Sequence, residues 1–325
     1  MMSALYAAIA RRRREWYAAR PDARGRLRRP VVSIGNIAAG GRGKTPFTAA
    51  VARILMSLGE RPAVLSRGYG RTQPDDGVVV VRDAGGMRAD LARAGDEPFM
   101  LARQLPGAIV VVSPDRYLGG RLAEHHLGAT VHVLDDGFQH FQLDRDIDIV
   151  LVAGDDLSAR TFPAGRLREP SDVLVAADAI VAVDDIDLPV GQAPVFRTSR
   201  RVGSPVFEDQ SQVDGVKVLA VAGIADPNRF FAALAGAGVT VAATRTFRDH
   251  HPYSARELAE LSAAARASGA GAIVTTEKDY VRLLPLRPFR MPIGWLPFTM
   301  EPEPADVFRD WLVTSMASAR DIVLG

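Results

Sequence analysis

The feature that most constrains the fold is a glycine-rich loop that joins an apolar run to a helical pattern. Residues 30–34 read PVVSI, residues 35–46 read GNIAAGGRGKTP, and residues 45–58 carry apolar side chains at helical spacing. A strand that runs through such a loop into a helix is the context of a phosphate-binding P-loop. The strict motif has its first glycine where this chain has Ala38, and we expect a small residue to suffice at that edge of the loop.

In a P-loop, backbone N–H groups line the phosphates, and the N-terminus of the following helix favours their negative charge. Lys44 is then expected to reach the β- and γ-phosphates, and Thr45 to offer its hydroxyl to Mg²⁺. A glycine-rich turn with an incidental lysine is the alternative, and the strand and helix around the loop argue against it. The rest of the nucleotide cradle is expected at Ala39, Gly40, Gly41, Arg42, Gly43 and Pro46.

Further apolar runs predict that this loop belongs to a mostly parallel, doubly wound α/β sheet. Helical patterns separate several of these runs, as in βαβ units whose strands lie parallel. The runs cover residues 63–65, 78–81, 108–112, 130–134, 147–152 and 176–183.

A polar stretch with prolines and glycines then extends to about residue 215 and predicts a hinge. The pattern restarts beyond it, with strands predicted at 216–221, 239–243 and 272–275 and helices at 227–235 and 254–267. We therefore expect three parts: a basic amphipathic helix within residues 1–29, a P-loop domain over 30–203, and a smaller α/β domain over 204–325.

Positive charge is concentrated at the start of the chain. The first thirty residues hold nine arginines and only two acids, a balance of +7 within a chain whose net charge is +2. Such a local excess suggests an anionic partner near the N-terminus rather than a protein that coats nucleic acid. No apolar run approaches the roughly 18–20 residues of a membrane span. The absence of cysteine excludes disulfides and thiolate metal sites.

The predicted N-terminal helix has two possible roles. Its apolar residues can share one face beside an arginine-rich flank, as in helices that lie on a membrane surface. The alternative is a helix that packs on its own domain and leaves its arginines in water. The residues concerned are Leu5, Tyr6, Ile9, Trp16 and Tyr17.

Two acidic motifs are candidates for phosphoryl-transfer chemistry. Residues 132–140 read HVLDDGFQH, and an apolar strand that ends in acids is typical of the Mg²⁺-holding strand of P-loop proteins. Because adjacent side chains point to opposite sides of a strand, one of Asp135 and Asp136 could bind the ion while the other binds a neighbour. Residues 95–98 read GDEP, where Asp96 could cap a helix or act as a base that takes a proton from a hydroxyl.

Two further motifs carry histidines or arginines. Residues 247–253 read FRDHHPY, but the sequence has no further Cys/His cluster, so we do not expect His250 and His251 to bind zinc. Residues 163–170 read PAGRLREP, a rigid loop whose Arg166 and Arg168 suit phosphate contacts. A solvated basic turn is the alternative for this loop.

Two classes of P-loop protein are disfavoured by single positions. Membrane-cycling ATPases carry a signature lysine immediately before the two glycines, where this chain has Ala39. GTPases read guanine with an [NT]-K-x-D element, and the nearest candidate, TTEKD at 275–279, has its lysine one position too late.

Eight motifs in order resemble those of one family. They read GNIAAGGRGKTP (35–46), SRGYG (66–70), GDEP (95–98), DDGFQH (135–140), PAGRLREP (163–170), GIADP (223–227), DHHPY (249–253) and TTEKD (275–279). Together they are similar to the motifs of the tetraacyldisaccharide 4'-kinases, the lipid A 4'-kinases of Gram-negative bacteria. Members often carry a longer and more apolar N-terminal segment than these thirty residues. This departure bears on the strength and mode of membrane attachment and not on the chemistry.

The resemblance implies transfer of the γ-phosphate of ATP, with Mg²⁺, to the 4'-hydroxyl of tetraacyldisaccharide 1-phosphate in lipid A biosynthesis. It also implies peripheral work at the cytoplasmic face of the inner membrane. In this resemblance Lys44 and Thr45 bind phosphate and Mg²⁺, Asp135 and Asp136 are the metal-site acids, Asp96 is the base and His250 pairs with it. The positions that support substrate or active centre are Tyr69, Arg116, Gln139, His140, Arg168 and Glu169.

Asp96 and His250 fall in different predicted domains, so this pair would form only when the hinge closes. Two other functions are compatible with the P-loop alone. One is a nucleotide-switched adaptor that hydrolyses ATP without phosphorylating a lipid. The other is a P-loop kinase for a soluble sugar or coenzyme.

Overall fold

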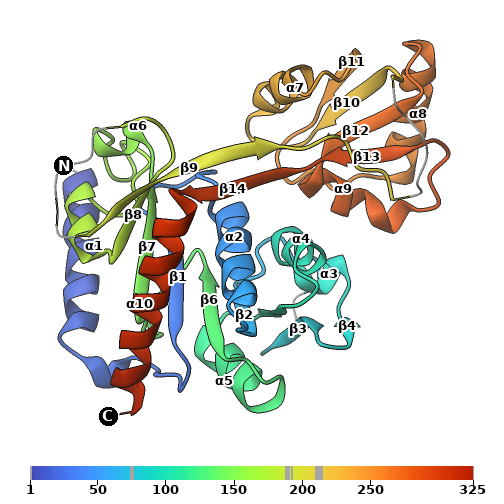
Figure 1. Ribbon diagram of the computed structural model, residues 1–325. Coiled ribbons are helices and arrows are strands. Elements are labelled where there is room, and N and C mark those ends of the chain that lie inside the picture. The colour runs from blue at the N-terminus through green and yellow to red at the C-terminus, as the bar shows by residue number, and fades with distance from the viewer. Residues whose placement is uncertain (1, 74–76, 187–190, 192, 209–214, 325) are drawn as a thin grey trace. The chain divides into compact units, whose positions relative to one another are not determined.

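A ten-stranded sheet runs through the first part of the structure (Figure 1). The computed structural model describes residues 2–73, 77–186, 191, 193–208 and 215–324. The sheet has the strand order β14-β9-β8-β7-β1-β6-β2-β5-β3-β4. Its strands are β1 (Val31–Asn36), β2 (Pro62–Ser66), β3 (Val79–Asp83), β4 (Gly86–Met87), β5 (Ile109–Val112), β6 (Val131–Asp135), β7 (Ile147–Val152), β8 (Ala179–Ala182), β9 (Val195–Val202) and β14 (Phe298–Glu303).

Parallel pairing extends from β9 to β5, and β3 and β4 add an antiparallel edge. This confirms the predicted mostly parallel, doubly wound α/β class. The helices of this part are α1 (Met2–Ala18), α2 (Lys44–Ser57), α3 (Leu91–Ala94), α4 (Asp96–Gln104), α5 (Arg116–His126), α6 (Gly154–Leu157) and α10 (Ala305–Leu324), with short 3₁₀ turns at η1 (Pro21–Ala23) and η2 (Ser171–Ala176).

Helices cover both faces of this sheet because alternate residues of the central strand point to opposite sides. On β1, Val32 and Ile34 belong to a buried cluster with Phe47 of α2. Val31 lies in a second cluster that includes Ala123 of α5. A strand buried on both faces reads as a continuous apolar run, which is why the sequence pattern identified it.

The chain divides into two compact units, and the C-terminal helix belongs to the first. Unit 1 comprises Met1–Ser199 with Met300–Gly325, and unit 2 comprises Arg200–Thr299. The expectation that the second domain runs to the end of the chain is therefore wrong for residues 300–325. The reason is the apolar stripe of α10, where Phe308 packs edge-on against Phe47 and Phe196, with ring centroids 5.9 and 4.9 Å apart.

The chain passes between the units within two strands rather than in a loop. One crossing falls at residues 199 and 200 inside β9, and the return falls at 299 and 300 inside β14. These two strands are neighbours in the order of the sheet. The polar stretch expected to form the hinge lies partly outside the described residues.

Unit 2 is a small α/β layer with its own core. Its four strands follow the order β11-β10-β12-β13, and all neighbours are parallel. Alternate residues of β10 point either toward α8 and α9 or toward α7. The elements are β10 (Val218–Ala222), β11 (Val241–Thr246), β12 (Ala272–Thr276), β13 (Ile293–Leu296), α7 (Pro227–Gly236), α8 (Ala255–Ala267), α9 (Glu277–Leu283) and η3 (Leu284–Leu286).

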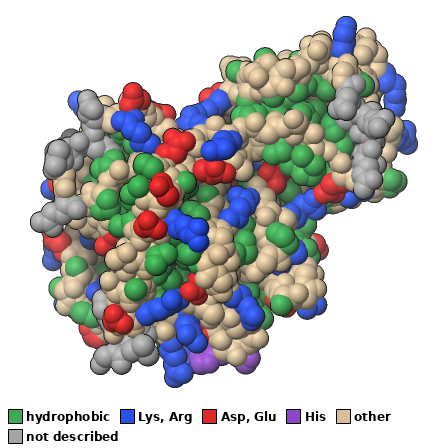
Figure 2. Space-filling model, in the orientation of Figure 1, with side chains coloured by type: hydrophobic (Ala, Val, Ile, Leu, Met, Phe, Trp, Pro, Cys, Tyr) green, Lys and Arg blue, Asp and Glu red, His purple; other side chains and the backbone are tan. Residues whose placement is uncertain are grey.

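Charged side chains of both signs are interspersed on the face drawn in Figure 2, so no single-sign field covers it. Among the described residues, no helix has both the length and the apolar character needed to cross a membrane.

Candidate active site

The glycine loop connects β1 to α2 and carries the backbone geometry that a phosphate cradle needs. Gly40 and Gly43 have φ angles of 108° and 80°, a region that side-chain-bearing residues rarely occupy. A Cβ atom at Gly43 would also lie 2.0 Å from the Sδ of Met300. Ala38 is fully buried and pairs with Leu167 in an isolated bridge. The position of the missing glycine therefore faces protein, which explains why a small apolar residue suits it.

Lys44 begins α2 and lies between two polar side chains. Its Nζ is 3.1 Å from Oδ1 of Asn36 and 3.5 Å from Oδ1 of Asp136. Strand β1 ends at Asn36 and β6 ends one residue before Asp136, and these strands are parallel neighbours. The carboxyl ends of such strands meet at one edge of the sheet, where α/β proteins bind their ligands.

Asp135 is the last residue of β6, and its carboxylate is buried under α2. Oδ1 accepts a hydrogen bond from Thr48 at 3.1 Å, and Oδ2 lies 3.4 Å from the hydroxyl of Thr45. Burial, with the negative charges of Glu97 and Asp136 nearby, raises the pKa of Asp135 to about 7. Carboxylate and hydroxyl oxygens are hard donors of the kind that divalent cations such as Mg²⁺ prefer.

Asp136 has a different set of partners. Burial acts to raise its pKa, but the positive charges of Lys44 and Arg168 outweigh it and hold the pKa below its ordinary value. Its φ angle is 61°, an uncommon conformation for a residue with a side chain, and such strain concentrates at functional sites. The two acids do diverge, as expected, but a backbone turn after the strand separates them rather than strand alternation.

The loop that reads PAGRLREP lies against the glycine loop. The N–H of Ala39 donates to the carbonyl of Arg166 at 2.8 Å, and the N–H of Arg168 donates to the carbonyl of Ile37 at 2.7 Å. Arg168 also binds the carboxylate of Asp136. This main-chain pairing between segments about 130 residues apart left no signal in the sequence pattern.

The other arginines of these loops bind acids of α6. Arg42 Nη2 lies 2.7 Å from Asp155 and 2.6 Å from Asp156, and Arg166 binds the same two carboxylates. Asp155 and Asp156 did not feature in the sequence analysis. An Asp-Asp pair that follows a buried strand, as this pair follows β7, was the available signal.

Four expected residues lie around this centre. Gln139 donates from Nε2 to the carbonyl of Asn36 at 2.9 Å and to the buried Glu169 at 3.2 Å. Arg116 begins α5 and is buried, and burial together with Arg67 lowers its pKa to about 10. Burial, with Arg116 and Arg145 nearby, lowers the pKa of His140 to about 4, so this imidazole is neutral near pH 7.

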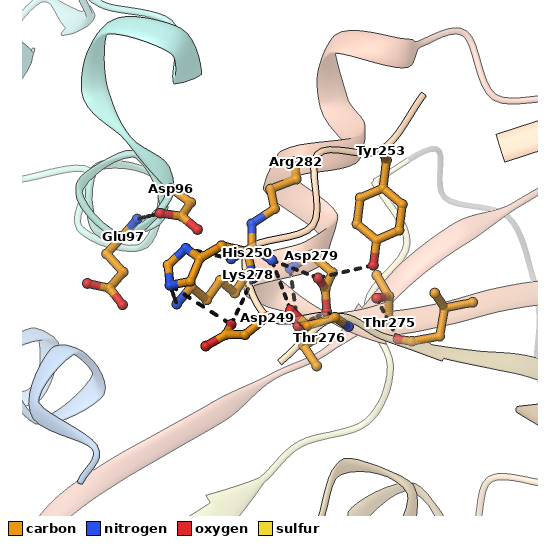
Figure 3. Close-up of polar contacts among 12 residues, drawn as sticks. Asp96, Glu97, Asp249, His250, Tyr253, Thr275, Thr276, Lys278, Asp279 and Arg282 are labelled. Atoms are coloured by element: carbon orange, nitrogen blue, oxygen red, sulfur yellow. Dashed lines mark hydrogen bonds and ion pairs between the residues drawn. The ribbon is translucent and has the colours of Figure 1, made fainter. Parts of the chain in front are cut away.

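Asp96 is the first residue of α4, and Gly95 occupies the N-cap position. Asp96 is therefore not the N-cap of this helix. Its Oδ1 accepts the N–H of Glu97 at 3.2 Å, and the residue is buried (Figure 3). A carboxylate at this position is stabilised by the helix N-terminus. Tyr69, by contrast, has an exposed side chain.

In unit 2, the two adjacent histidines have different environments. His251 lies 2.9 Å from Glu257 and stacks on Phe247 with a centroid separation of 4.6 Å. His250 has a φ angle of 58°. Lys278 Nζ lies 3.0 Å from its Nε2, and Arg282 Nη2 lies 3.3 Å from its Nδ1 (Figure 3). A neutral imidazole has only one acceptor nitrogen, so only one of Lys278 and Arg282 can donate a hydrogen bond to His250 at a time.

A buried carboxylate, Asp279, organises the segment around His250. It accepts hydrogen bonds from the N–H of Gly223, the hydroxyls of Tyr253 and Thr276, and the guanidinium of Arg282. The motifs GIADP, DHHPY and TTEKD therefore meet at one side chain (Figure 3). The TTEKD motif contributed to the family resemblance and argued against a GTPase, but nothing in its sequence predicted this role for Asp279.

Known proteins match the chain over almost its whole length. The family model described as tetraacyldisaccharide-1-P 4'-kinase matches residues 1–317. The tetraacyldisaccharide 4'-kinase of Geobacter metallireducens is 43% identical over 275 residues, which cover 80% of each chain. That of Nitrobacter winogradskyi is 43% identical over 303 residues, 87% of this chain and 81% of the relative.

A solved structure agrees with these sequences. The "apo" form of LpxK from Aquifex aeolicus, crystallised in complex with ATP, aligns with a TM-score of 0.82 and 31% identity over 97% of both chains. A whole-chain match of this kind, with the eight motifs in order, confirms the resemblance. The chain belongs to the tetraacyldisaccharide-1-P 4'-kinase family.

Proposed function

We propose that this protein transfers the γ-phosphate of ATP to the 4'-hydroxyl of tetraacyldisaccharide 1-phosphate. The family match over residues 1–317 is the observation that carries the proposal. The convergence of Lys44, Asp135 and Asp136 at the end of β1 and β6 supports it, because a P-loop kinase needs its cations and acids at that edge of the sheet.

In this proposal the glycine loop from Ala39 to Pro46 cradles the phosphates. Lys44 exchanges its contacts with Asn36 and Asp136 for the β- and γ-phosphate oxygens. Arg168 adds positive charge on the side of Asp136. Positioned cations of this kind stabilise the charge that spreads over the transferred group.

The Thr45 hydroxyl and the Asp135 carboxylate are suited to hold Mg²⁺. Both are hard oxygen donors on adjacent elements, and Mg²⁺ completes its shell with phosphate oxygens and water. When bound there, the ion neutralises charge on the β- and γ-phosphate oxygens. Asp136, which already binds Arg168 and Lys44, is better placed to orient those cations than to bind the ion directly.

For the acceptor, we propose that Asp96 and His250 act together on the 4'-hydroxyl. An alcohol has a pKa far above 7, so a base can take its proton only as the bond to phosphorus develops. Asp96 belongs to unit 1 and His250 to unit 2.

We also propose peripheral contact with the anionic cytoplasmic face of the inner membrane, because the proposed acceptor is a lipid. The exposed side chains of Leu5, Ile9 and Trp16 on α1 support this, together with the arginines of the same helix. Each basic residue near an anionic surface contributes about 1 kcal/mol of attraction.

The deciding experiment incubates the purified protein with [γ-³²P]ATP, Mg²⁺ and tetraacyldisaccharide 1-phosphate in detergent micelles. We expect labelled lipid from the wild-type protein and none from Lys44→Ala. Soluble glucosamine and a nucleoside serve as comparison acceptors. Failure of the folded protein to label the lipid, or equal labelling of a soluble acceptor, would overturn the proposal.

A further inference from the structure

Helix α1 is docked on the PAGRLREP segment of the active centre, not merely attached to the end of the chain. The hydroxyl of Thr161 donates to the carbonyl of Ser3 at 3.0 Å, and the N–H of Ala164 donates to the Ser3 hydroxyl at 3.1 Å. The ring of Tyr6 lies edge-on to Phe162, with centroids 6.0 Å apart. One face of the helix is thus committed to the protein, and Tyr6 belongs to that face.

The most buried polar contact of this helix is between Arg14 and Glu169. Nε and Nη2 of Arg14 donate to the two carboxylate oxygens at 2.9 and 2.8 Å. The side chain of Glu169 is only 3% exposed and that of Arg14 is 16% exposed. The guanidinium also lies over the ring of Phe138, 4.3 Å from its centroid. A two-pronged contact of this kind fixes the orientation as well as the position of a carboxylate.

Glu169 is connected to the nucleotide loop through Gln139 and Asn36. Gln139 Nε2 donates both to Glu169 and to the carbonyl of Asn36. The side chain of Asn36, in turn, accepts from Lys44. A chain of hydrogen bonds, none longer than 3.2 Å, therefore joins Arg14 of α1 to the lysine of the P-loop through Glu169, Gln139 and Asn36.

The neighbouring residue gives a second route. Arg168 precedes Glu169 directly, binds the carboxylate of Asp136, and bonds through its N–H to the carbonyl of Ile37. Removal of Arg14 leaves a buried carboxylate with Gln139 as its remaining donor among the contacts described. A buried charge that loses its partner is strongly destabilised in its position, and Arg168 is the adjoining residue of the chain.

We propose that Arg14 is a positioning residue for phosphoryl transfer: from α1 it holds Glu169, and through Glu169 it holds Gln139 and Arg168 against the P-loop. The order of the active centre therefore depends on the docking of the surface helix. This inference rests on the proposed function, and it assigns α1 a role beyond attachment to a lipid surface.

The test compares Arg14→Ala with Arg12→Ala. Arg12 lies on the same helix and is exposed, so its removal changes the charge of the helix by the same amount. Turnover is measured with the lipid acceptor in uncharged detergent, where headgroup attraction plays no part. Binding to vesicles with anionic lipid is measured separately by sedimentation. Binding of a fluorescent ATP analogue with Mg²⁺ is measured without any acceptor.

We expect Arg14→Ala to have a kcat at least tenfold below that of Arg12→Ala, with KM for the lipid within twofold and equal vesicle binding. The affinity for the ATP analogue should fall at least threefold in Arg14→Ala relative to Arg12→Ala. Arg14→Lys keeps the positive charge but cannot make the two-pronged contact with Glu169, so its kcat and its affinity for the ATP analogue should lie between those of the wild type and Arg14→Ala. If circular dichroism shows that Arg14→Ala does not fold, Arg14→Lys replaces it in both comparisons.

Equal kcat and equal nucleotide affinity in the two alanine variants would overturn the inference, as would a loss confined to vesicle binding and the KM for the lipid. If the wild-type protein labels no lipid at all, the proposed function fails. The nucleotide-binding comparison would still decide whether Arg14 orders the P-loop.

Discussion

Nη1 of Arg168 lies 2.9 Å from both carboxylate oxygens of Asp136. Lys44 approaches the same carboxylate at 3.5 Å, so one acid faces two of the cations that the proposed reaction needs. In the proposed reaction, Asp136 orients both cations toward the transferred phosphate. Such pre-organised charge is commonly the largest single contribution to catalysis of this type.

Replacement of Arg168 should therefore lower turnover more than nucleotide affinity. We expect Arg168→Ala to reduce kcat roughly 100-fold, the order of magnitude for loss of one pre-organised donor. Arg168→Lys should recover only part of the lost kcat, because a lysine ammonium group has fewer N–H donors than the guanidinium and a different geometry. Steady-state kinetics with varied ATP measures both constants. Arg160→Ala, an exposed arginine of the same segment, is the control, and an equal loss there would refute a specific role.

The proposed pair of Asp96 and His250 predicts non-additive losses. Asp96→Ala and His250→Ala should each lower kcat more than they raise the KM for ATP, because both act on the acceptor. The double variant should lose little more than the worse single variant, as residues that act as one unit do. A double-variant loss equal to the product of the two single losses would mean that the residues act independently.

The buried Asp279 predicts a coupled effect on stability and turnover. Asp279→Asn removes the negative charge that pairs with the buried Arg282 and should lower the free energy of unfolding by about 3 kcal/mol. Tyr253→Phe removes one hydrogen bond and should cost about 1 kcal/mol.

Urea unfolding measures both variants. Asp226→Ala, which removes the N-cap of α7 in the same unit, is a control that should cost about 1 kcal/mol without changing kcat. We expect Asp279→Asn also to lower kcat, because Asp279 organises the segment that carries His250. If kcat stays unchanged, as in the control, Asp279 does not position His250.

His140 predicts a pH dependence of stability. Its folded pKa, about 4, lies below the unfolded value of 6.5. Between these values the unfolded chain binds the proton more readily, so stability is present above pH 6.5 and is lost as the pH falls toward 4. The loss from this residue should be about 2 kcal/mol between pH 7 and pH 5.

Urea unfolding of the wild type and of His140→Gln at the two pH values isolates this contribution. The glutamine variant should show a smaller decrease on acidification, by about that amount. His126→Gln, at the last position of α5, serves as the matched histidine control. An identical decrease in all three proteins would show that His140 does not titrate as described.

The exposed apolar residues of α1 predict surface binding that can be separated from catalysis. Leu5→Ser together with Ile9→Ser should weaken binding to anionic vesicles roughly tenfold or more, since each buried aliphatic side chain contributes about 1.5 kcal/mol or more. Turnover in detergent should change less, because neither side chain is among the docking contacts of α1. Unchanged vesicle sedimentation of the double variant would exclude this face as the attachment surface.

The sequence determined the local elements of this protein. A continuous apolar run followed by GGRGKT can form little other than a buried strand, a phosphate loop and a helix, and β1 and α2 occupy residues close to those predicted. The sequence of alternating runs similarly determined the parallel sheet, because local hydrophobic periodicity reflects which faces must be buried. The motifs also identified the family, which the comparisons confirm.

The tertiary structure decided which of these elements work together. The sequence patterns predicted no separate element for helix α10, and packing alone assigned it to the first sheet. The same holds for Arg14, whose partner Glu169 lies 155 residues away. Hydrophobic periodicity indicates that a side chain will be buried. It does not indicate which side chains it will pack against, because the pairing of distant segments depends on the shape of the whole core.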